Sequence, residues 1–564
     1  MPQSILRRDR VVDMLPHALS DAALEDALFA SKAELEAQDA ETLTISVTPD
    51  RLDLLSEGGL GLLLQGATET AKGILPRKAL DGASSGPTID VDSSVRPLRP
   101  VIAGIVLGAP TDAGLDEGTL AEAVRFQEIL HATVGRDRRA ASLGIYPYDR
   151  LVPPFRYALE PMRGVRFVPL DASEEVPADR FFQEHPMALR YGALGRQEDA
   201  CLTLRDSRRT VLSLPPILNG RTAGEARVGD RLLLLESTGL RERAVRESLG
   251  LLSVVFVSRG WAVGPVTVRE EGGPTSDGRG ILAARSIDLP SAMLHSIAGT
   301  PYGSAEVESR LARVRLGVHP HSGGWRVEVP PWRPDLGSAV DIAEEVILAQ
   351  VIRAEDGIVP ASSTRGRRRW ETVFRRRFAI ALLGLGYAAP YTSLLVSESA
   401  VARIHGALPI RLANPPSAEA AFLRDRLLLS HVEVLAHNTR HGYPQLFGEV
   451  APVVVPSPDA ESGGETRYHV GAIRASDTAG FADAASLIDY LLRTVDIVAV
   501  REPADIPGTI AGRAARVRVA GEVVAEIGEI HPEVLAEIGV PVAVAWAELD
   551  LTRLAPLVGR RDRD

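Results

Sequence analysis

Three segments rich in glycine, serine, proline or arginine interrupt the chain, and they constrain its fold more than any other feature. They span 83–87 (ASSGP), 271–280 (EGGPTSDGRG) and 361–369 (ASSTRGRRR), and their composition is typical of linkers. At ~100–200 residues per domain, a chain of 564 residues is expected to form roughly three to five domains. We therefore predict four domains, over residues 1–88, 89–270, 281–357 and 370–564.

Hydrophobic periodicity within these domains predicts helices and strands together, which gives a multidomain α+β fold. Apolar residues recur at helical spacing in five segments: 21–29, 118–134, 339–352, 371–384 and 418–437. Alternating apolar residues predict strands at 42–48, 101–107, 211–214, 325–330 and 542–546. A hairpin with its turn at Ala520-Gly521 is also expected. Residues 281–357 read as a compact module with about two helices.

Composition excludes several classes of protein. The 63 basic and 74 acidic side chains give a net charge of −11, which argues against a basic nucleic-acid-binding coat. A single cysteine, Cys201, excludes disulfide frameworks and cysteine zinc sites, and its apolar surroundings predict burial. No apolar run reaches the ~18 residues of a membrane span, and the N-terminus lacks a signal-peptide core. We therefore expect a soluble cytoplasmic protein with no membrane partner.

The sequence carries no complete catalytic motif that we recognise. A Walker A loop, HExxH, GxSxG and a GxGxxG after a strand are all missing. His437 and His441 are four residues apart, but no carboxylate lies between them. A lone histidine pair of this kind more often belongs to the surface or the core than to a metal site. The chain is therefore expected to lack an active site that works by itself.

An acidic cluster is the sharpest local signal, and it has two explanations. Asp341, Glu344 and Glu345 share one side of the first turns of the predicted helix, and Asp335 lies in the loop before it. Four carboxylates suit a magnesium ion that retains some water ligands. Alternatively, Ser338-x-x-Asp341 is a capping-box pattern, and acids in a first turn favour the helix dipole. The spacing alone leaves both explanations open.

Polar side chains interrupt two apolar strand segments and could line one pocket. Ser213 lies in Leu212-Ser-Leu-Pro-Pro, whereas Glu236 and Thr238 follow the run Leu232–Leu235. The alternative is that these are ordinary strand-end residues satisfied by the backbone. Arginine runs at 135–139, 365–369 and 375–377 could contact phosphates, or could simply be solvated surface.

These segments together resemble the β subunit of phenylalanine–tRNA ligase in its archaeal and eukaryotic form. The stretches that carry the resemblance follow in order along nearly the whole chain. The first is Val47–Ser56 (VTPDRLDLLS), and the stretches around Val168–Asp171 and Ser213–Gly220 (SLPPILNG) resemble an editing domain. Pro330–Asp335 (PPWRPD), Val340–Val346 (VDIAEEV) and Ile527–Pro532 (IGEIHP) follow. The resemblance implies an N-terminal α/β domain, an editing domain, a winged-helix-like module that bears magnesium, and a catalytically silent class II synthetase-like domain.

The resemblance also implies partners and site residues. The expected complex has two α and two β subunits, binds tRNA, and charges it with phenylalanine using ATP in the α subunit. The predicted helix 371–384 would form the interface with α. Magnesium would be bound by Asp335, Asp341, Glu344 and Glu345. A pocket formed by Leu204, Ser213, Glu236 and Thr238 would hydrolyse tyrosyl-tRNA.

Two departures from the family pattern leave an alternative open. Archaeal relatives usually have Asp where this chain has Glu236, and many relatives have His where it has Ala193. A divergent paralogue, dedicated to resistance or to one pathway, or a scaffold without editing activity would also explain the sequence. A stand-alone nucleic-acid-binding protein is a third hypothesis, which the net charge opposes.

Overall fold

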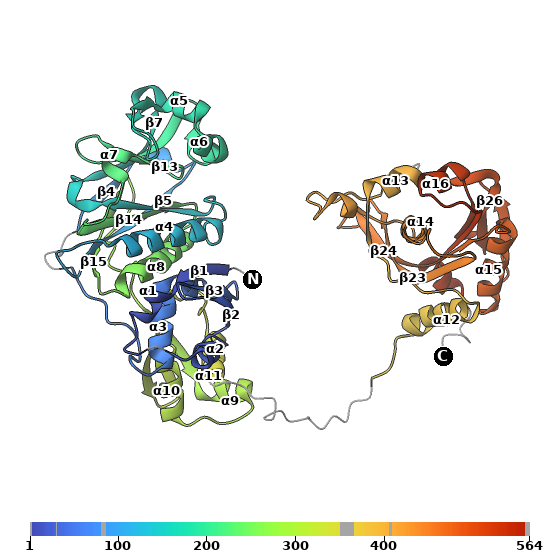
Figure 1. Ribbon diagram of the computed structural model, residues 1–564, viewed down its shortest axis with the longest axis horizontal. Coiled ribbons are helices and arrows are strands. Elements are labelled where there is room, and N and C mark those ends of the chain that lie inside the picture. The colour runs from blue at the N-terminus through green and yellow to red at the C-terminus, as the bar shows by residue number, and fades with distance from the viewer. Residues whose placement is uncertain are drawn as a thin grey trace. The chain divides into compact units, whose positions relative to one another are not determined.

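The computed structural model describes residues 3–17, 19–29, 31–80, 86–349, 366–404 and 409–558. It contains two compact units, Met1–Val359 and Pro360–Asp564, whose elements are labelled in Figure 1. Parts of two predicted linkers (83–85 and 361–365) lie outside the described residues, as does the end of the helix predicted to reach 352.

The first unit begins with a small three-stranded antiparallel sheet in the order β1-β3-β2. Its strands are β1 (Gln3–Arg7), β2 (Ala33–Gln38) and β3 (Thr42–Val47), and its helices are α1 (Arg8–Val12), α2 (Asp21–Phe29) and α3 (Glu57–Ala67). Ser56 caps α3 by accepting a hydrogen bond from the amide of Gly59. Gly66 allows close packing, since an added Cβ would lie 1.8 Å from the carbonyl oxygen of Arg313.

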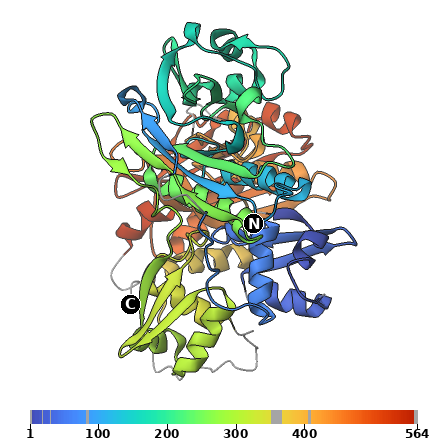
Figure 2. The same cartoon turned by 90° about the vertical axis from the view of Figure 1, so that its left-hand side faces the viewer.

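Two sheets form the centre of the first unit, and both can be followed in Figure 2. The four-stranded sheet β15-β5-β14-β6 consists of β5 (Val101–Gly108), β6 (Ala141–Pro147), β14 (Leu232–Gly239) and β15 (Ala262–Pro265), and packs against α4 (Glu117–Ala132) and α8 (Glu242–Val257). The second sheet has the order β13-β12-β11-β7-β4-β16-β17, with β10 paired to β11. Its strands are β4 (Thr88–Val91), β7 (Phe155–Pro161), β10 (Arg196–Gln197), β11 (Ala200–Arg205), β12 (Val211–Leu214), β13 (Leu218–Asn219), β16 (Thr267–Glu270) and β17 (Thr275–Ser276).

Short elements complete this central region. They are the strand pair β8 (Arg166–Phe167) and β9 (Val176–Pro177), and the helices α5 (Ala178–Glu184), α6 (Pro186–Tyr191) and α7 (Arg221–Gly224). A small cluster of buried apolar residues lies beneath α5 and α6 and includes Phe181 and Cys201. The predicted burial of Cys201 is confirmed.

A compact module follows, over residues 285–349. The three-stranded antiparallel sheet β18-β20-β19 is formed by β18 (Arg285–Pro290), β19 (Gly317–His321) and β20 (Gly324–Val329). Its helices are α9 (Ser291–Ala298), α10 (Ser304–Arg313) and α11 (Ala339–Leu348). Its buried core includes Leu311, Val327 and Ile342.

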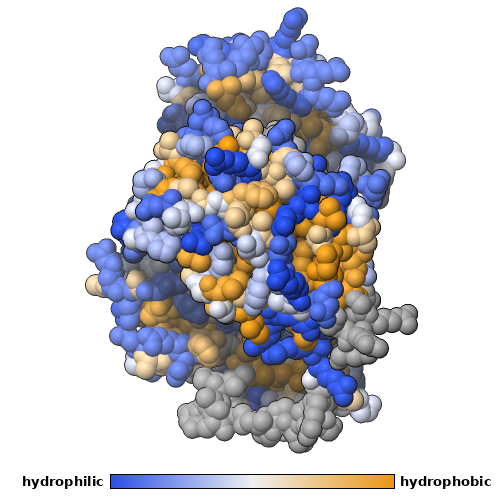
Figure 3. All heavy atoms as spheres, turned by 90° about the vertical axis from the view of Figure 1, so that its right-hand side faces the viewer, coloured by the Kyte–Doolittle hydropathy of each residue, from blue (hydrophilic) through white to orange (hydrophobic). Residues whose placement is uncertain are grey.

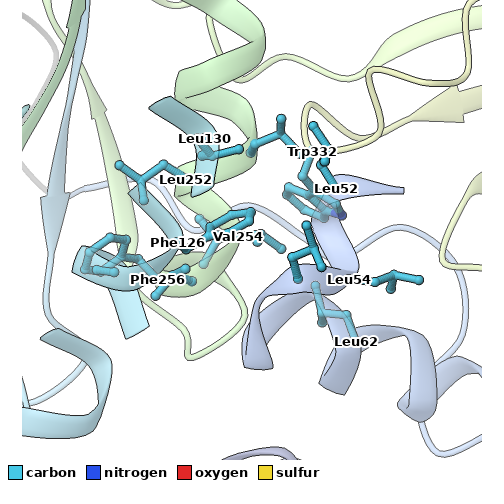
Figure 4. Close-up of a cluster of buried hydrophobic side chains, with 14 of the residues drawn as sticks. Leu52, Leu54, Leu62, Phe126, Leu130, Leu252, Val254, Phe256 and Trp332 are labelled. Carbon is cyan, nitrogen blue, oxygen red and sulfur yellow. The ribbon is translucent and has the colours of Figure 1, made fainter. Parts of the chain in front are cut away.

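One apolar core joins the N-terminal sheet region to the helices of the central sheet. Figure 4 shows Leu52, Leu54 and Leu62 close to side chains of α4 and α8 and to Trp332. Most of these side chains are fully buried, including Leu54, Phe126 and Val254. At ~25 cal/mol per Å² of buried apolar surface, contacts of this extent hold separate segments as one unit.

The second unit is built on a six-stranded antiparallel sheet in the order β23-β24-β28-β27-β26-β25. Its strands are β23 (Gln445–Pro456), β24 (Gly464–Ala475), β25 (Val500–Pro503), β26 (Thr509–Val519), β27 (Glu522–Ile530) and β28 (Val544–Asp550). Helices α12 (Trp370–Gly384) and α15 (Phe481–Arg493) share one apolar core with this sheet. The remaining elements are β21 (Leu395–Val396), α13 (Glu398–Ile404), β22 (Phe422–Leu423), α14 (Leu428–His437), α16 (Pro532–Glu537) and α17 (Leu551–Leu554).

The multidomain α+β fold and most predicted elements are confirmed, but three predictions need correction. The segment 271–280 contains β17, which pairs with β16 through Val268 and Arg269. The module after it has three helices rather than two. The helix predicted over 418–437 begins only at Leu428, because the chain before it forms β22 and buries the guanidinium of Arg424 against Glu449. None of the helices in the described residues has the length and apolar character to cross a membrane.

Candidate functional site

A cavity of about 200 Å³ lies beside β6, an edge strand of the four-stranded sheet. Its wall combines apolar side chains of α4 with the segment 213–219, residues of β6 and Glu236 in the middle of β14. Ser213 and Glu236 both line it, although 23 residues separate them in the sequence. The two residues therefore meet in one site, as the sequence analysis predicts.

Glu236 occupies the middle of β14, between Gly104 of β5 and Gly144 of β6. Its side chain is almost fully buried. One oxygen, Oε1, lies 2.9 Å from the hydroxyl of Tyr146, and the other, Oε2, has no hydrogen-bond partner among the described residues. Burial raises the pKa of Glu236 to about 7, against the opposing effects of Tyr146 and Arg99. A buried carboxylate with a free oxygen is an acceptor for a ligand.

Tyr146 connects Glu236 to Ser213. Its hydroxyl oxygen lies 2.9 Å from Ser213 Oγ as well as 2.9 Å from Glu236 Oε1. Ser142, Gly144 and Tyr146 alternate along β6, so they share one face of the sheet. Because Gly144 has no side chain, the phenol can lie over it; an added Cβ would be 2.3 Å from the hydroxyl oxygen. The strand sequence thus places the hydroxyl opposite Glu236.

Thr238 lies two residues further along β14, on the same face, within a buried polar network. The guanidinium of Arg99 donates hydrogen bonds to Thr238 Oγ1 at 2.9 Å, to the Thr238 carbonyl oxygen at 2.6 Å and to Ser142 Oγ at 3.2 Å. Ser142 lines the cavity, but Thr238 does not. Burial lowers the pKa of Arg99 to about 10, which leaves it charged at neutral pH. Arg99 is therefore a buried cation next to the cavity.

The opposite wall contains a histidine whose two ring nitrogens are both engaged. His131 Nδ1 lies 3.1 Å from Glu128, and Nε2 accepts a hydrogen bond from the amide of Leu143 at 2.9 Å. Arg138 donates to both oxygens of Glu128 and to the carbonyl oxygens of Pro216 and Ile217. Burial lowers the pKa of His131. These groups hold α4 against the segment 213–219 and leave no histidine nitrogen for a ligand.

Leu204 and Ala193 do not line the cavity. Leu204 is directly opposite Ser213 in the β11–β12 register and is fully buried in the core behind the cavity. Ala193 is exposed and does not line the cavity. The structure therefore gathers Ser213 and Glu236, places Leu204 and Thr238 behind them, and leaves Ala193 outside.

The four acidic residues predicted to bind magnesium make three different interactions. Arg333 donates to both oxygens of Asp335 and to Glu345, at distances down to 2.7 and 2.8 Å respectively. The Asp341 carboxylate accepts from the amides of Gly337 and Ser338, so it completes the capping box of α11. Glu344 is exposed and pairs with Lys32 of the N-terminal sheet region at 2.8 Å.

These contacts form a buried ion cluster that joins two parts of the first unit. The side chains of Arg333, Asp335 and Glu345 are 3–4% exposed. Arg51 and Asp53 make a second buried pair, with two hydrogen bonds of 3.0 Å, and electrostatic interactions link the two pairs. Attraction to Arg333 lowers the pKa of Asp335 although burial opposes this. Electrostatic interactions between buried charged side chains thus link the segment 47–56 to the segment 330–345.

In this arrangement the four carboxylates do not fit a magnesium ion. Within the ranges that the structure describes, no group of three or more histidine, cysteine, aspartate or glutamate side chains could hold a metal. Arg333 competes for two members of the predicted set, and the helix cap takes a third. The magnesium site stays a prediction.

Sequence reasoning missed Tyr146, Arg99 and Arg333, which organise the two clusters. Tyr146 and Gly144 could have been found from their alternation with Ser142 in the strand segment 141–147. Arg99 and Arg333 are hidden among the many arginines of the chain, and nothing in their local sequence signals burial. Their importance depends on partners that are far away in the sequence.

Comparisons with known proteins agree along the length of the chain. Two family models match: the tRNA synthetase B5 domain over residues 287–350 and the phenylalanyl tRNA synthetase beta chain CLM domain over residues 357–551. A phenylalanine–tRNA ligase β subunit of Korarchaeum cryptofilum is 29% identical over 96% of this chain and 97% of its own length. The corresponding subunit of Methanococcoides burtonii is 27% identical over 92% and 94%.

A solved structure agrees with the fold of the first unit. An N-terminal fragment of the phenylalanyl-tRNA synthetase β subunit from Pyrococcus horikoshii matches with a TM-score of 0.57 and 23% identity. The match covers 62% of this chain and 99% of the fragment. The curated relatives match nearly from end to end and both family models agree with them, so the chain is similar over most of its length to phenylalanine–tRNA ligase β subunits.

Proposed function

We propose that this chain works in the cytoplasm as the β subunit of a phenylalanine–tRNA ligase, bound to an α subunit in an α2β2 tetramer. In this proposal α holds the ATP and charges the tRNA with phenylalanine, and β supplies scaffold and tRNA contacts. The similarity to β subunits along the chain and the missing nucleotide-binding motifs both support this division of labour.

Helix α12 supports the proposed association with α. Its inner face buries Phe374 and Phe378, yet Val373, Ile380 and Leu383 are 48–56% exposed on the same helix. Figure 3 views one face of the second unit and shows hydrophobic patches there among charged side chains. Exposed apolar residues gathered on one helix are typical of a surface that a partner covers.

We further propose that the cavity at Glu236 hydrolyses tyrosyl-tRNA. The observation that carries this proposal is that Glu236, which lines the cavity, keeps one carboxylate oxygen, Oε2, without a hydrogen-bond partner among the described residues. The tyrosine hydroxyl would donate to that oxygen, whereas phenylalanine would leave it unpaired. A site built to hydrogen-bond a substrate hydroxyl can discriminate against the analogue without that hydroxyl by ~10⁴-fold or more.

Two measurements test these proposals. Co-expressed with its α subunit, the chain should form a stable complex that charges tRNA when ATP and phenylalanine are present, whereas the chain alone should not. The complex should also deacylate tyrosyl-tRNA, and Glu236→Gln should slow this step while charging is unchanged. Glu242→Gln, at an exposed carboxyl of α8, is the matched control.

A second candidate rests on Glu236 and Ala193, the two departures from the family pattern. A divergent paralogue or a scaffold without editing activity would still form the complex, but tyrosyl-tRNA would remain intact in its presence. That result would remove the editing proposal and leave the charging proposal in place. Failure to bind any α subunit would overturn both.

A further inference from the structure

We infer that Tyr146 is the positioning residue that makes Glu236 an acceptor for a ligand hydroxyl, by holding Oε1 and leaving Oε2 without a protein partner. This inference rests on the proposed editing function and adds a residue to it. No contact of Tyr146 with a ligand is required, because it acts through Glu236.

The hydrogen bonds of the Tyr146 hydroxyl have a direction that depends on the charge of Glu236. Tyr146 has one hydroxyl proton and two acceptors, Ser213 Oγ and Glu236 Oε1, each 2.9 Å away. When Glu236 is ionised, the phenol must donate to the carboxylate, and the Ser213 hydroxyl can donate to the phenol. Hydrogen bonds to an ionised group are stronger than those between neutral groups. The two hydrogen bonds that run from Ser213 through Tyr146 to Glu236 therefore favour the ionised form of Glu236.

Two other groups lie near enough to Glu236 to be compared with Tyr146. Arg99 also lowers the pKa of Glu236, whereas Tyr157 does not shift it; burial and, to a lesser extent, Glu236 raise the pKa of Tyr157 instead. Arg99 directs its hydrogen bonds to Thr238 and Ser142, and Tyr157 donates to the Arg99 carbonyl oxygen at 3.0 Å. Neither makes a hydrogen bond to Glu236. Glu128, His131 and Arg138 bond to one another and to backbone on the far wall.

Strand β6 leaves space for the Tyr146 phenol at Gly144. An alanine side chain at position 144 would come within 2.3 Å of the Tyr146 hydroxyl. The ring therefore depends on a glycine two residues earlier, on the same face of β6, opposite Glu236 in the β6–β14 register. This supports a geometric role for the hydroxyl beyond the apolar packing that any aromatic ring would provide.

The variant Tyr146→Phe tests the inference in the full-length chain, with Tyr157→Phe as the matched control. Both phenols are buried in the first unit, but the Tyr157 hydroxyl bonds to backbone. The titration of Glu236 can be followed as the infrared absorption of a protonated carboxylic acid that disappears in Glu236→Gln. Tyr146→Phe removes a hydrogen bond to the charged form of Glu236, so it should raise the pKa of Glu236 by about one unit. Tyr157→Phe should leave that pKa unchanged.

In the complex with α, Tyr146→Phe should reduce kcat/KM for tyrosyl-tRNA deacylation by about tenfold or more, with unchanged charging. Gly144→Ala, which displaces the phenol without removing it, should shift the infrared titration in the same direction. An unchanged titration in Tyr146→Phe, or an equal shift in Tyr157→Phe, would overturn the inference. If the wild-type complex leaves tyrosyl-tRNA intact, the editing proposal fails, but the infrared titration still decides the role of Tyr146.

Discussion

Asp335 and Glu236 are both buried carboxylates of the first unit, yet folding shifts their pKa values in opposite directions. Arg333 donates to both oxygens of Asp335, and the pKa of that carboxyl falls. Glu236 receives one hydrogen bond from a neutral phenol, keeps one oxygen free, and its pKa rises to about 7. A paired carboxylate stabilises a fold, whereas an underpaired one beside a cavity is available to a ligand.

The largest effect is expected from removing the cation of the paired cluster. Arg333→Met leaves Asp335 and Glu345 buried without their partner, which should cost about 3–5 kcal/mol of stability. Chemical denaturation of the full chain, followed through the transition of the first unit, measures this loss. The control Arg326→Met removes an exposed arginine paired with exposed Asp288 and should cost at most ~1 kcal/mol.

A companion variant separates charge imbalance from lost packing. Replacing Arg333, Asp335 and Glu345 together by apolar residues of similar size should restore most of the stability lost in Arg333→Met. An equally unstable triple variant would show that the cluster acts through its shape, and the contrast with Glu236 would then lose its electrostatic basis.

The next effect is the pH dependence of the underpaired carboxylate. Glu236 binds its proton more tightly in the folded chain, so its contribution to stability is present at low pH and declines as pH rises from about 4.5 to above 7. Between pH 5 and pH 8, the wild type should lose about 2–3 kcal/mol relative to Glu236→Gln. Urea unfolding of both proteins at the two pH values measures the difference.

The lowered pKa of Asp335 has the opposite consequence. Its contribution is present above the ordinary pKa of aspartate and is lost as pH falls through the lowered value. Asp335→Asn should therefore weaken the chain most near neutral pH and least in strong acid. Curves of the same sign for the two sites would contradict the contrast drawn between them.

The sequence predicted the elements of this fold better than the contacts that organise its sites. The strand pattern indicated Ser213, Glu236 and Thr238, and the resemblance added Leu204, but none of this showed that Tyr146 lies between Ser213 and Glu236. Arg51 and Arg333 are close in space although more than 280 residues separate them in the sequence. Local periodicity cannot predict such pairing, because it depends on the packing of distant segments.

The smallest effect is expected at the acidic residues of α11, and it decides whether Asp341 caps the helix or binds magnesium. In the structure, Asp341 accepts three hydrogen bonds from Gly337 and Ser338, so Asp341→Asn should cost about 1 kcal/mol by weakening the cap of α11. The same loss should be measured with and without magnesium, because the other three carboxylates have partners of their own. Thermal unfolding of wild type, Asp341→Asn and Glu344→Gln over a magnesium titration makes the comparison. Stabilisation by magnesium in the wild type that disappears in both variants would instead support the four-carboxylate site, since a ligand stabilises only the state that binds it.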